Sequence, residues 1–246
     1  SWELLTAGER LLAERLAIFP AGTTAAVAVQ VCADGELDAL DVPDLLLALV
    51  DKSLLQVTSG GDAVRYRMLE TIREYGVERL DERGELAAAR ARHAAYFAGA
   101  ARRLDPVLRT RDQLRALAEF TAERDNMLAA LRYLGDSGDS SAAELVLDLC
   151  WYWTITGAHT EMATWTQFVL DATVPDGSLE ASRADPATAS RRNSPAAASP
   201  APVSSARAGE SPARLRVRAS RLLARILGAS TDAYESWVDL QQELTE

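Results

Sequence analysis

The stretch from Leu49 to Leu80, LVDKSLLQVTSGGDAVRYRMLETIREYGVERL, constrains the fold more than any other part of the chain. Residues 54–58 and 64–68 alternate apolar and polar side chains, and the glycine-bearing sequence SGGDA joins them, which predicts a β-hairpin. Helical patterns end just before this hairpin and resume just after it. A helix that runs into a hairpin and then into another helix is the outline of a winged helix.

Further helices are expected ahead of this stretch. Thr6 and Glu9 have the spacing of a capping box, and apolar residues at helical spacing follow them. A short helix is expected over residues 24–32, and Pro43 suits the first turn of a third helix. Residues 1–84 are therefore expected to form one winged-helix domain.

The chain from residue 85 to residue 174 has helical patterns throughout, separated only by short breaks. Paired helices joined by tight turns are typical of a bundle or an α-solenoid, and here they predict a domain that resembles tetratricopeptide (TPR) repeats. The expected fold class is mainly α, a winged-helix domain followed by a TPR-like α-solenoid. Helices are expected at 85–104, 110–122, 123–134, 140–156 and 159–172.

Composition changes at residue 175. Residues 175–212 are rich in Ala, Pro, Ser and Arg and hold almost no large apolar side chain, which predicts a flexible linker. Its arginines are interpreted as solubilising charge, with an arm for nucleic acid or an acidic partner as the alternative. Residues 213–246 return to a helical pattern and are expected to add one more helical hairpin to the solenoid.

Charge argues against DNA binding. The formal net charge is −10, and an acidic surface repels phosphate backbones. In a winged helix the helix before the hairpin enters the groove, and here that helix carries Asp44 and Asp51 against Lys52, the only lysine of the chain. It offers no Arg, Asn or Gln to read base edges. We therefore expect no direct contact with nucleic acid.

No set of catalytic residues can be assembled from the sequence, and the chain is not expected to be an enzyme. His93 and His159 are the only histidines, and neither has partners at metal-ligand spacing. Cys32 and Cys150 lie in apolar runs and are interpreted as reduced core thiols. No leader pattern and no apolar run of membrane-spanning length is present, which predicts a cytoplasmic protein without membrane contact.

Large aromatic residues mark the expected solenoid. Trp151 and Trp153 are two positions apart on one expected helix, so their side chains point in nearly opposite directions. One of the two is expected to pack with Trp165, and the other to face the next hairpin or the concave surface. An exposed indole beside Glu161 is the candidate site for a partner or effector; burial of both would make them core residues.

The segments LVDKSLL, YRMLETIREYGVERL, RHAAYFAGAA, AERDNMLAALRYL and WYWTITGAHTEMATW together resemble the large bacterial STAND-class regulators of the NB-ARC type. This resemblance implies a regulatory, signal-sensing module of a larger ATP-dependent transcriptional regulator, which couples a TPR-like sensor to a nucleotide-binding core. The ATPase core, with its ATP or ADP, is expected outside this chain, and no cofactor is expected within it. The alternative is a transcription factor whose winged helix binds DNA directly.

The resemblance also implies a nucleotide-sensing position. The family carries a Met-His-Asp motif after the hairpin, and the matching residues here are Met68, Leu69 and Glu70. Leu69 stands where the family has its histidine and cannot donate a hydrogen bond to phosphate. Plain packing between hairpin and helix is the alternative role for these residues. The implied partners are the nucleotide-binding core of the same parent protein and an unidentified protein or small-molecule effector.

Overall fold

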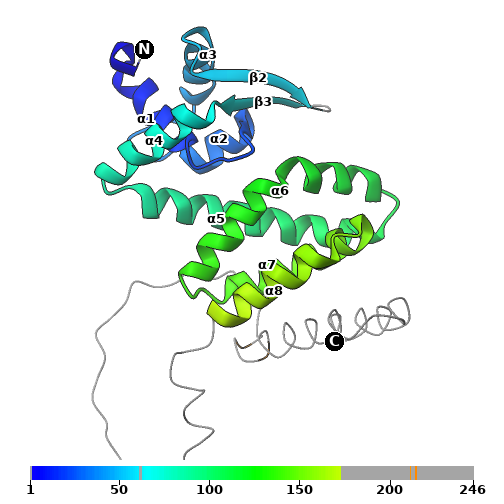
Figure 1. The fold of residues 1–246 in the computed structure, drawn as a ribbon. Helices are drawn as coiled ribbons and strands as arrows, with labels where there is room; N and C mark the ends of the chain where they lie inside the picture. The colour runs from blue at the N-terminus through cyan, green and yellow to red at the C-terminus, as the bar shows by residue number, and fades with distance from the viewer. Residues whose placement is uncertain (1, 61–62, 173–210, 212–213, 215–246) are drawn as a thin grey trace, which may run out of the picture.

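The computed structural model describes residues 2–60, 63–172, 211 and 214 (Figure 1). The fold is mainly helical, with one small antiparallel sheet in its first part. Apart from residues 211 and 214, the expected linker at 175–212 and the expected hairpin at 213–246 lie outside the described residues. The first part, which we call the N-terminal unit, comprises η1 (Trp2–Leu4), α1 (Ala7–Leu16), β1 (Thr23–Thr24), α2 (Ala25–Cys32), α3 (Val42–Asp51), β2 (Leu55–Gly60), β3 (Ala63–Met68) and α4 (Glu70–Glu82).

The hairpin expected from the alternating pattern is confirmed as β2 and β3, with Leu55 paired to Met68. A third strand, β1, was not expected. Its residue Thr23 pairs with Tyr66 on the other side of β3, which makes β3 the central strand of the sheet. Two threonines are too short a stretch to show any alternation, so no sequence pattern could have indicated this strand.

The helices of the N-terminal unit follow from local signals and from close packing. The capping box of α1 is confirmed, because Thr6 Oγ1 accepts from the backbone N–H of Glu9 and Glu9 Oε2 accepts from that of Thr6 at 2.7 Å. Helix α4 packs against α1 at Gly76, where an added Cβ would lie 2.8 Å from the Cβ of Ala17. The core holds fully buried leucines from α1 and α3 together with Phe19.

The second part, which we call the helical unit, lies below the N-terminal unit in Figure 1 and contains no strand among its described residues. Helix α5 packs along α6, and α7 packs along α8. Its core holds Phe97, Phe120, Met127 and Trp153, each without exposed surface. Its elements are α5 (Leu86–Leu104), η2 (Asp105–Arg109), α6 (Gln113–Asp136), α7 (Ser141–Thr156) and α8 (His159–Ala172).

One boundary expected in this unit is wrong. The two helices expected at 110–122 and 123–134 are a single helix, α6, of 24 residues. The sequence between them, FTAERDNM, contains neither Gly nor Pro, so nothing there stops a helix. By contrast, α7 ends where expected, at Gly157, which adopts the left-handed conformation with φ of 72°.

Candidate functional site

The junction between the two units contains the most specific polar contacts of the structure. Arg65 on β3 forms two parallel bonds with Glu123 on α6, from Nη1 to Oε1 at 2.5 Å and from Nη2 to Oε2 at 3.1 Å. The Nη2 group also donates to the carbonyl oxygen of Gly22 at 3.1 Å. Both charged side chains are only 12% exposed, so this pair is well shielded from solvent.

Asn126, one helical turn after Glu123, completes this contact. Its side chain is fully buried, and Nδ2 donates to the carbonyl oxygen of Gly22 at 3.0 Å and to Glu123 Oε2 at 2.7 Å. Its Oδ1 accepts from the backbone N–H of Ala21 at 3.4 Å. The turn that leads into β1 is therefore hydrogen-bonded to α6 through a backbone N–H group and a backbone carbonyl oxygen. These bonds hold the sheet against the helical unit.

A second polar network joins α1 and α2 to the start of α5. Arg15 is nearly fully buried, donates to the carbonyl oxygen of Cys32 at 2.8 Å, and pairs with Asp34 at 2.8 Å and Glu85 at 3.2 Å. Burial by itself would raise the pKa of Asp34, but the hydrogen bond from Arg15 and two backbone N–H donors outweigh it and lower that pKa. The carboxylate is thus held in its charged form as the partner of a buried guanidinium.

His93 lies between the units as well. Its ring packs 4.9 Å from that of Phe19 in the N-terminal unit and 4.6 Å from that of Phe97 on α5, measured between centroids. Burial lowers the pKa of His93 to about 4, although a hydrogen bond with Asn126 acts in the opposite direction. His93 Nε2 is buried and has no hydrogen-bond partner among the described residues. At neutral pH this histidine is therefore an uncharged part of the junction.

A cavity of about 580 Å³, which we call the junction cavity, opens beside His93. The segment that follows α1, helices α4, α5 and α6, and Trp165 of α8 form its walls. Three arginines line it, Arg73, Arg90 and Arg132, against one carboxylate, Asp136. A cavity with mixed apolar and cationic walls has the size of ordinary small-molecule sites.

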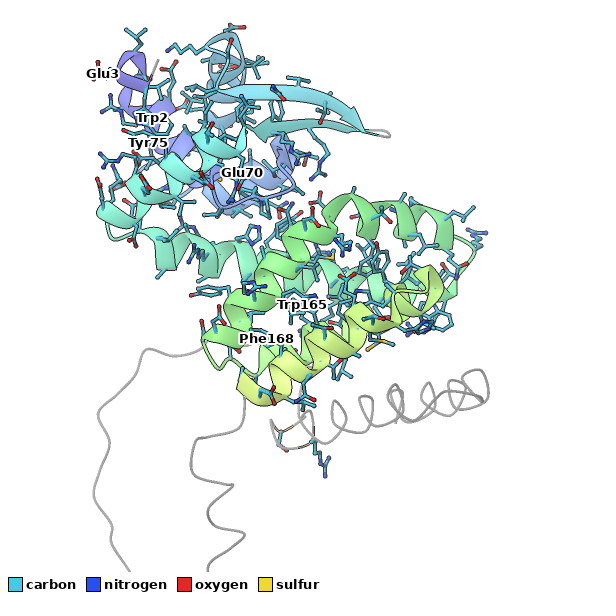
Figure 2. All side chains as sticks on the ribbon, in the orientation of Figure 1. Trp2, Glu3, Glu70, Tyr75, Trp165 and Phe168 are labelled. Carbon is cyan, nitrogen blue, oxygen red and sulfur yellow. The ribbon has the colours of Figure 1, made fainter. Side chains whose placement is uncertain are left out.

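The residues of the expected nucleotide-sensing position lie together at the end of β3. Met68 is buried and Leu69 is about half exposed, at the N-terminal boundary of α4. Glu70 is exposed and accepts two bonds from Arg73, at 3.0 Å and 2.5 Å (Figure 2). The hydrogen bond from Arg73 lowers the pKa of Glu70. Glu70 thus forms an ion pair within its own helix.

The tryptophans expected at a partner site separate into two environments. Trp153 has no exposed surface, so it is a core residue. Trp151 is partly buried; its Nε1 donates to the carbonyl oxygen of Leu108 at 3.2 Å, and Arg109 lies over its ring. Glu161 pairs with Arg124 at 2.7 Å.

Trp165, the third tryptophan of that prediction, packs against Phe168 on α8 with 5.6 Å between the ring centroids, and both project toward α6 (Figure 2).

Within the described part of the chain, no group of three or more His, Cys, Asp or Glu side chains is arranged to hold a metal ion. Over the same residues, no helix combines the length and apolar character needed to cross a membrane. Cys32 and Cys150 are both buried, as expected, and neither forms a disulfide with a described residue.

Arg65, Glu123 and Asn126 were not singled out as site residues from the sequence. The segment that carries Glu123 and Asn126, AERDNMLAAL, was noted only as part of a resemblance. Its local signal is a carboxylate and an amide three positions apart, which lie on the same face of a helix. Their partner Arg65 lies 58 positions away in the sequence, which no local pattern can indicate.

The chain is similar to several mycobacterial proteins. One is "Putative HTH-type transcriptional regulator Rv0890c" of Mycobacterium tuberculosis (strain ATCC 25618 / H37Rv), 35% identical over 172 residues, or 70% of this chain and 19% of the relative. "Putative HTH-type transcriptional regulator Mb0914c" of Mycobacterium bovis (strain ATCC BAA-935 / AF2122/97) matches with the same identity and coverage.

A shorter relative is "Uncharacterized protein Rv0894" of Mycobacterium tuberculosis, 35% identical over 98 residues, or 39% of this chain and 25% of the relative. The chain thus spans about a fifth of the length of the regulators it matches. No family model matches it. No solved structure matches it either.

Proposed function

We propose that this chain is the regulatory part of a larger transcriptional regulator, in which a winged-helix unit and a TPR-like unit relay a signal without touching DNA. The names of the mycobacterial relatives support the role in transcription. The observation that carries the regulatory interpretation is the set of buried contacts between Arg65, Glu123 and Asn126 at the junction of the two units. These contacts couple the hairpin to α6.

The winged-helix assignment rests on the order and packing of the elements. Three helices precede a hairpin, and a short strand between the first two helices pairs with the hairpin to make a three-stranded sheet. The TPR-like assignment rests on α5 to α8, which pack as two consecutive helical pairs with short connections. Both assignments are part of the proposal.

The exposed face of α3 supports a protein partner over DNA. It presents Asp44, Leu47 and Asp51, and Leu47 is 55% exposed. Lys52, the nearest cation, is held by Glu9, with Nζ 2.5 Å from Oε2 and 2.6 Å from Oε1. A face of carboxylates and leucine would repel phosphates and has no donor for base edges. We propose that it contacts another part of the parent protein, the nucleotide-binding core implied by the resemblance.

The same core would hold any ATP or ADP. Leu69 and Glu70 are proposed to lie near it because both are exposed at the end of the hairpin, beside α4. A leucine and an ion-paired glutamate offer no hydrogen-bond donor for a phosphate. Their contribution would therefore be contact between protein surfaces.

A reporter assay in the parent protein tests this proposal. Leu47→Glu should abolish the regulated change in transcription, because it places a third carboxylate on the proposed contact face. Leu114→Glu is the matched control, since Leu114 is 80% exposed on α6, in the helical unit. Equal behaviour of the two variants would contradict the proposal.

A second function, direct DNA binding by this winged helix, is favoured by the term HTH-type in the names of the relatives. Titration of the 246-residue chain into a fluorescent mixed-sequence duplex at low salt distinguishes the two. Under the first proposal no salt-sensitive binding occurs. Salt-sensitive binding that Lys52→Gln abolishes, and that Arg111→Gln leaves intact, would establish the second function instead.

A further inference from the structure

We propose that the junction cavity is a binding site for a small organic anion with a flat apolar body, such as an aromatic carboxylate or phosphate monoester. This inference does not depend on whether the parent protein regulates transcription. Its basis is the combination of two arginines without an ion-pair partner and a buried polar atom without a hydrogen-bond partner among the described residues, with an apolar wall in one cavity of about 580 Å³.

The first argument is charge. Three arginines and one aspartate line the cavity, in a chain whose formal net charge is −10, and the charge of one of them, Arg73, is already balanced by Glu70. Arg90 and Arg132 form no ion pair with any described carboxylate, although acidic residues outnumber basic ones by 36 to 26. Unpaired guanidinium groups that face one cavity attract an anion and can bind it through paired N–H donors.

The second argument is the position of the guanidinium groups of Arg73 and Arg132. Arg73 donates to the carbonyl oxygen of Ala17 at 3.2 Å and is paired with Glu70, so its side chain is fixed at the edge of the cavity. Arg132 lies over the ring of Trp165, with 5.3 Å between its Cζ and the ring centroid. The cation–π contact directs Arg132 along the aromatic wall of the cavity. An anion bound there would therefore meet a charged group and a flat apolar surface together.

The third argument is His93. Its imidazole forms part of the cavity wall, is 3% exposed, and has an Nε2 atom without a hydrogen-bond partner among the described residues. A buried polar atom without a partner is costly, so it calls for an explanation, and a bound group that hydrogen-bonds to it would supply one. Leu128 and Val77 supply apolar wall in the same cavity, which a purely inorganic anion would leave unfilled.

The occupant would also bridge the two units. Ile18 and Arg73 come from the N-terminal unit, whereas Arg90, Arg132 and Trp165 come from the helical unit. A ligand that contacts both sets stabilises the arrangement in which they face one cavity. The site is therefore placed where binding favours one relative position of the units.

Calorimetric titration of the 246-residue chain with 1-naphthyl phosphate and 1-naphthoate tests the proposal, with 1-naphthol as the uncharged analogue and inorganic phosphate as the anion without an apolar body. At least one naphthyl anion should bind in a one-to-one ratio, and added salt should weaken that binding. The preferred anion identifies the head group. The two controls should bind at least about tenfold more weakly.

Variants place the binding in the cavity. Arg90→Gln and Arg132→Gln should each weaken binding of the naphthyl anion by about tenfold or more, and Asp136→Asn should strengthen it. Arg111→Gln is the matched control, because Arg111 is exposed, outside the cavity, and loses the same charge. Circular dichroism melting of each variant confirms that it is folded.

Three results would overturn the proposal. They are the absence of binding by both naphthyl anions, binding of 1-naphthol as tight as that of its phosphate, and equal affinities in the Arg90, Arg132 and Arg111 variants. None of these results bears on DNA binding or on the α3 face, so the failure of this site is distinguishable from the failure of the proposed function.

Discussion

The ring of Phe168 on α8 occupies the position beside Gly135 of α6 where any other residue would place a side chain. A Cβ added to Gly135 would lie 2.4 Å from Cε1 and 2.9 Å from Cζ of that ring. These are far below van der Waals contact, so the two helices are in close contact only because residue 135 has no side chain.

Gly135→Ala is therefore expected to lower the free energy of unfolding, although alanine is the better helix former. Overpacking at such a site costs about 1–3 kcal/mol. The matched control is Gly99→Ala on α5, where the nearest atom to an added Cβ is Arg103 Nη1 at 3.4 Å. That control should gain up to about 1 kcal/mol from helix propensity alone. Urea unfolding of both variants checks the prediction, and a stabilised Gly135 variant would contradict it.

Loss of the junction ion pair should destabilise the protein strongly. Arg65→Met leaves Glu123 shielded from solvent without its charged partner, which is expected to cost about 2–4 kcal/mol. Arg115→Met breaks the exposed pair with Glu119 on the same helix α6, where the side chains are 69% and 49% exposed, and serves as the control. It should cost no more than about 0.5 kcal/mol. Equal losses in thermal unfolding would show that the junction pair adds nothing beyond a surface contact.

The stability of the protein should fall as pH is lowered from about 6.5 to about 5. Burial lowers the pKa of His93 from 6.5 to about 4, so the unfolded chain binds a proton in this window and the folded chain does not. The stabilisation is fully present above the unfolded pKa, and about 2 kcal/mol of it should be lost by about pH 5.

Urea midpoints across this window measure the loss, and His159→Gln, which removes the exposed histidine, should leave it unchanged. The imidazole protons of His93 give an independent readout by NMR titration. Their titration in the folded protein with a midpoint near pH 6.5 would refute the prediction.

Both thiols should be unreactive in the folded chain. Cys32 and Cys150 are buried, which keeps a reagent from both sulfur atoms, and burial also raises the pKa of Cys32 to about 12, so this thiol is not ionised at neutral pH. Ellman's reagent should modify neither cysteine in native buffer and both after addition of urea. Prompt modification of one equivalent in native buffer would mean that one of the two is accessible.

Local features of this fold could be predicted from the sequence. Thr6 and Glu9 predicted the start of the first helix, and the alternation around SGGDA predicted the hairpin. Both predictions were possible because capping and strand patterns depend on neighbours within a few positions. The unbroken α6 could also have been predicted, since neither Gly nor Pro lies near the expected break between Ala122 and Glu123. The division expected there therefore had no local stop signal behind it.

The junction could not be predicted, because it depends on contacts between distant segments. Arg65 and Glu123 lie 58 positions apart, and Gly22 and Asn126 lie 104 apart. In the sequence, none of these four residues differs from an ordinary surface residue. Only folding brings them together. The same holds for the junction cavity, whose arginines come from three helices.

Helix α6 is held at two places along its length. Glu123 and Asn126 attach it to the sheet, and Gly135 presses it against α8. Residues 126 and 135 are separated by about 14 Å along the helix axis. Such a rod has little freedom to bend, so tilting it at the sheet must swing its far end against the Phe168 ring, where no spare room exists. We therefore expect a displacement of the hairpin to be felt at α8 through α6.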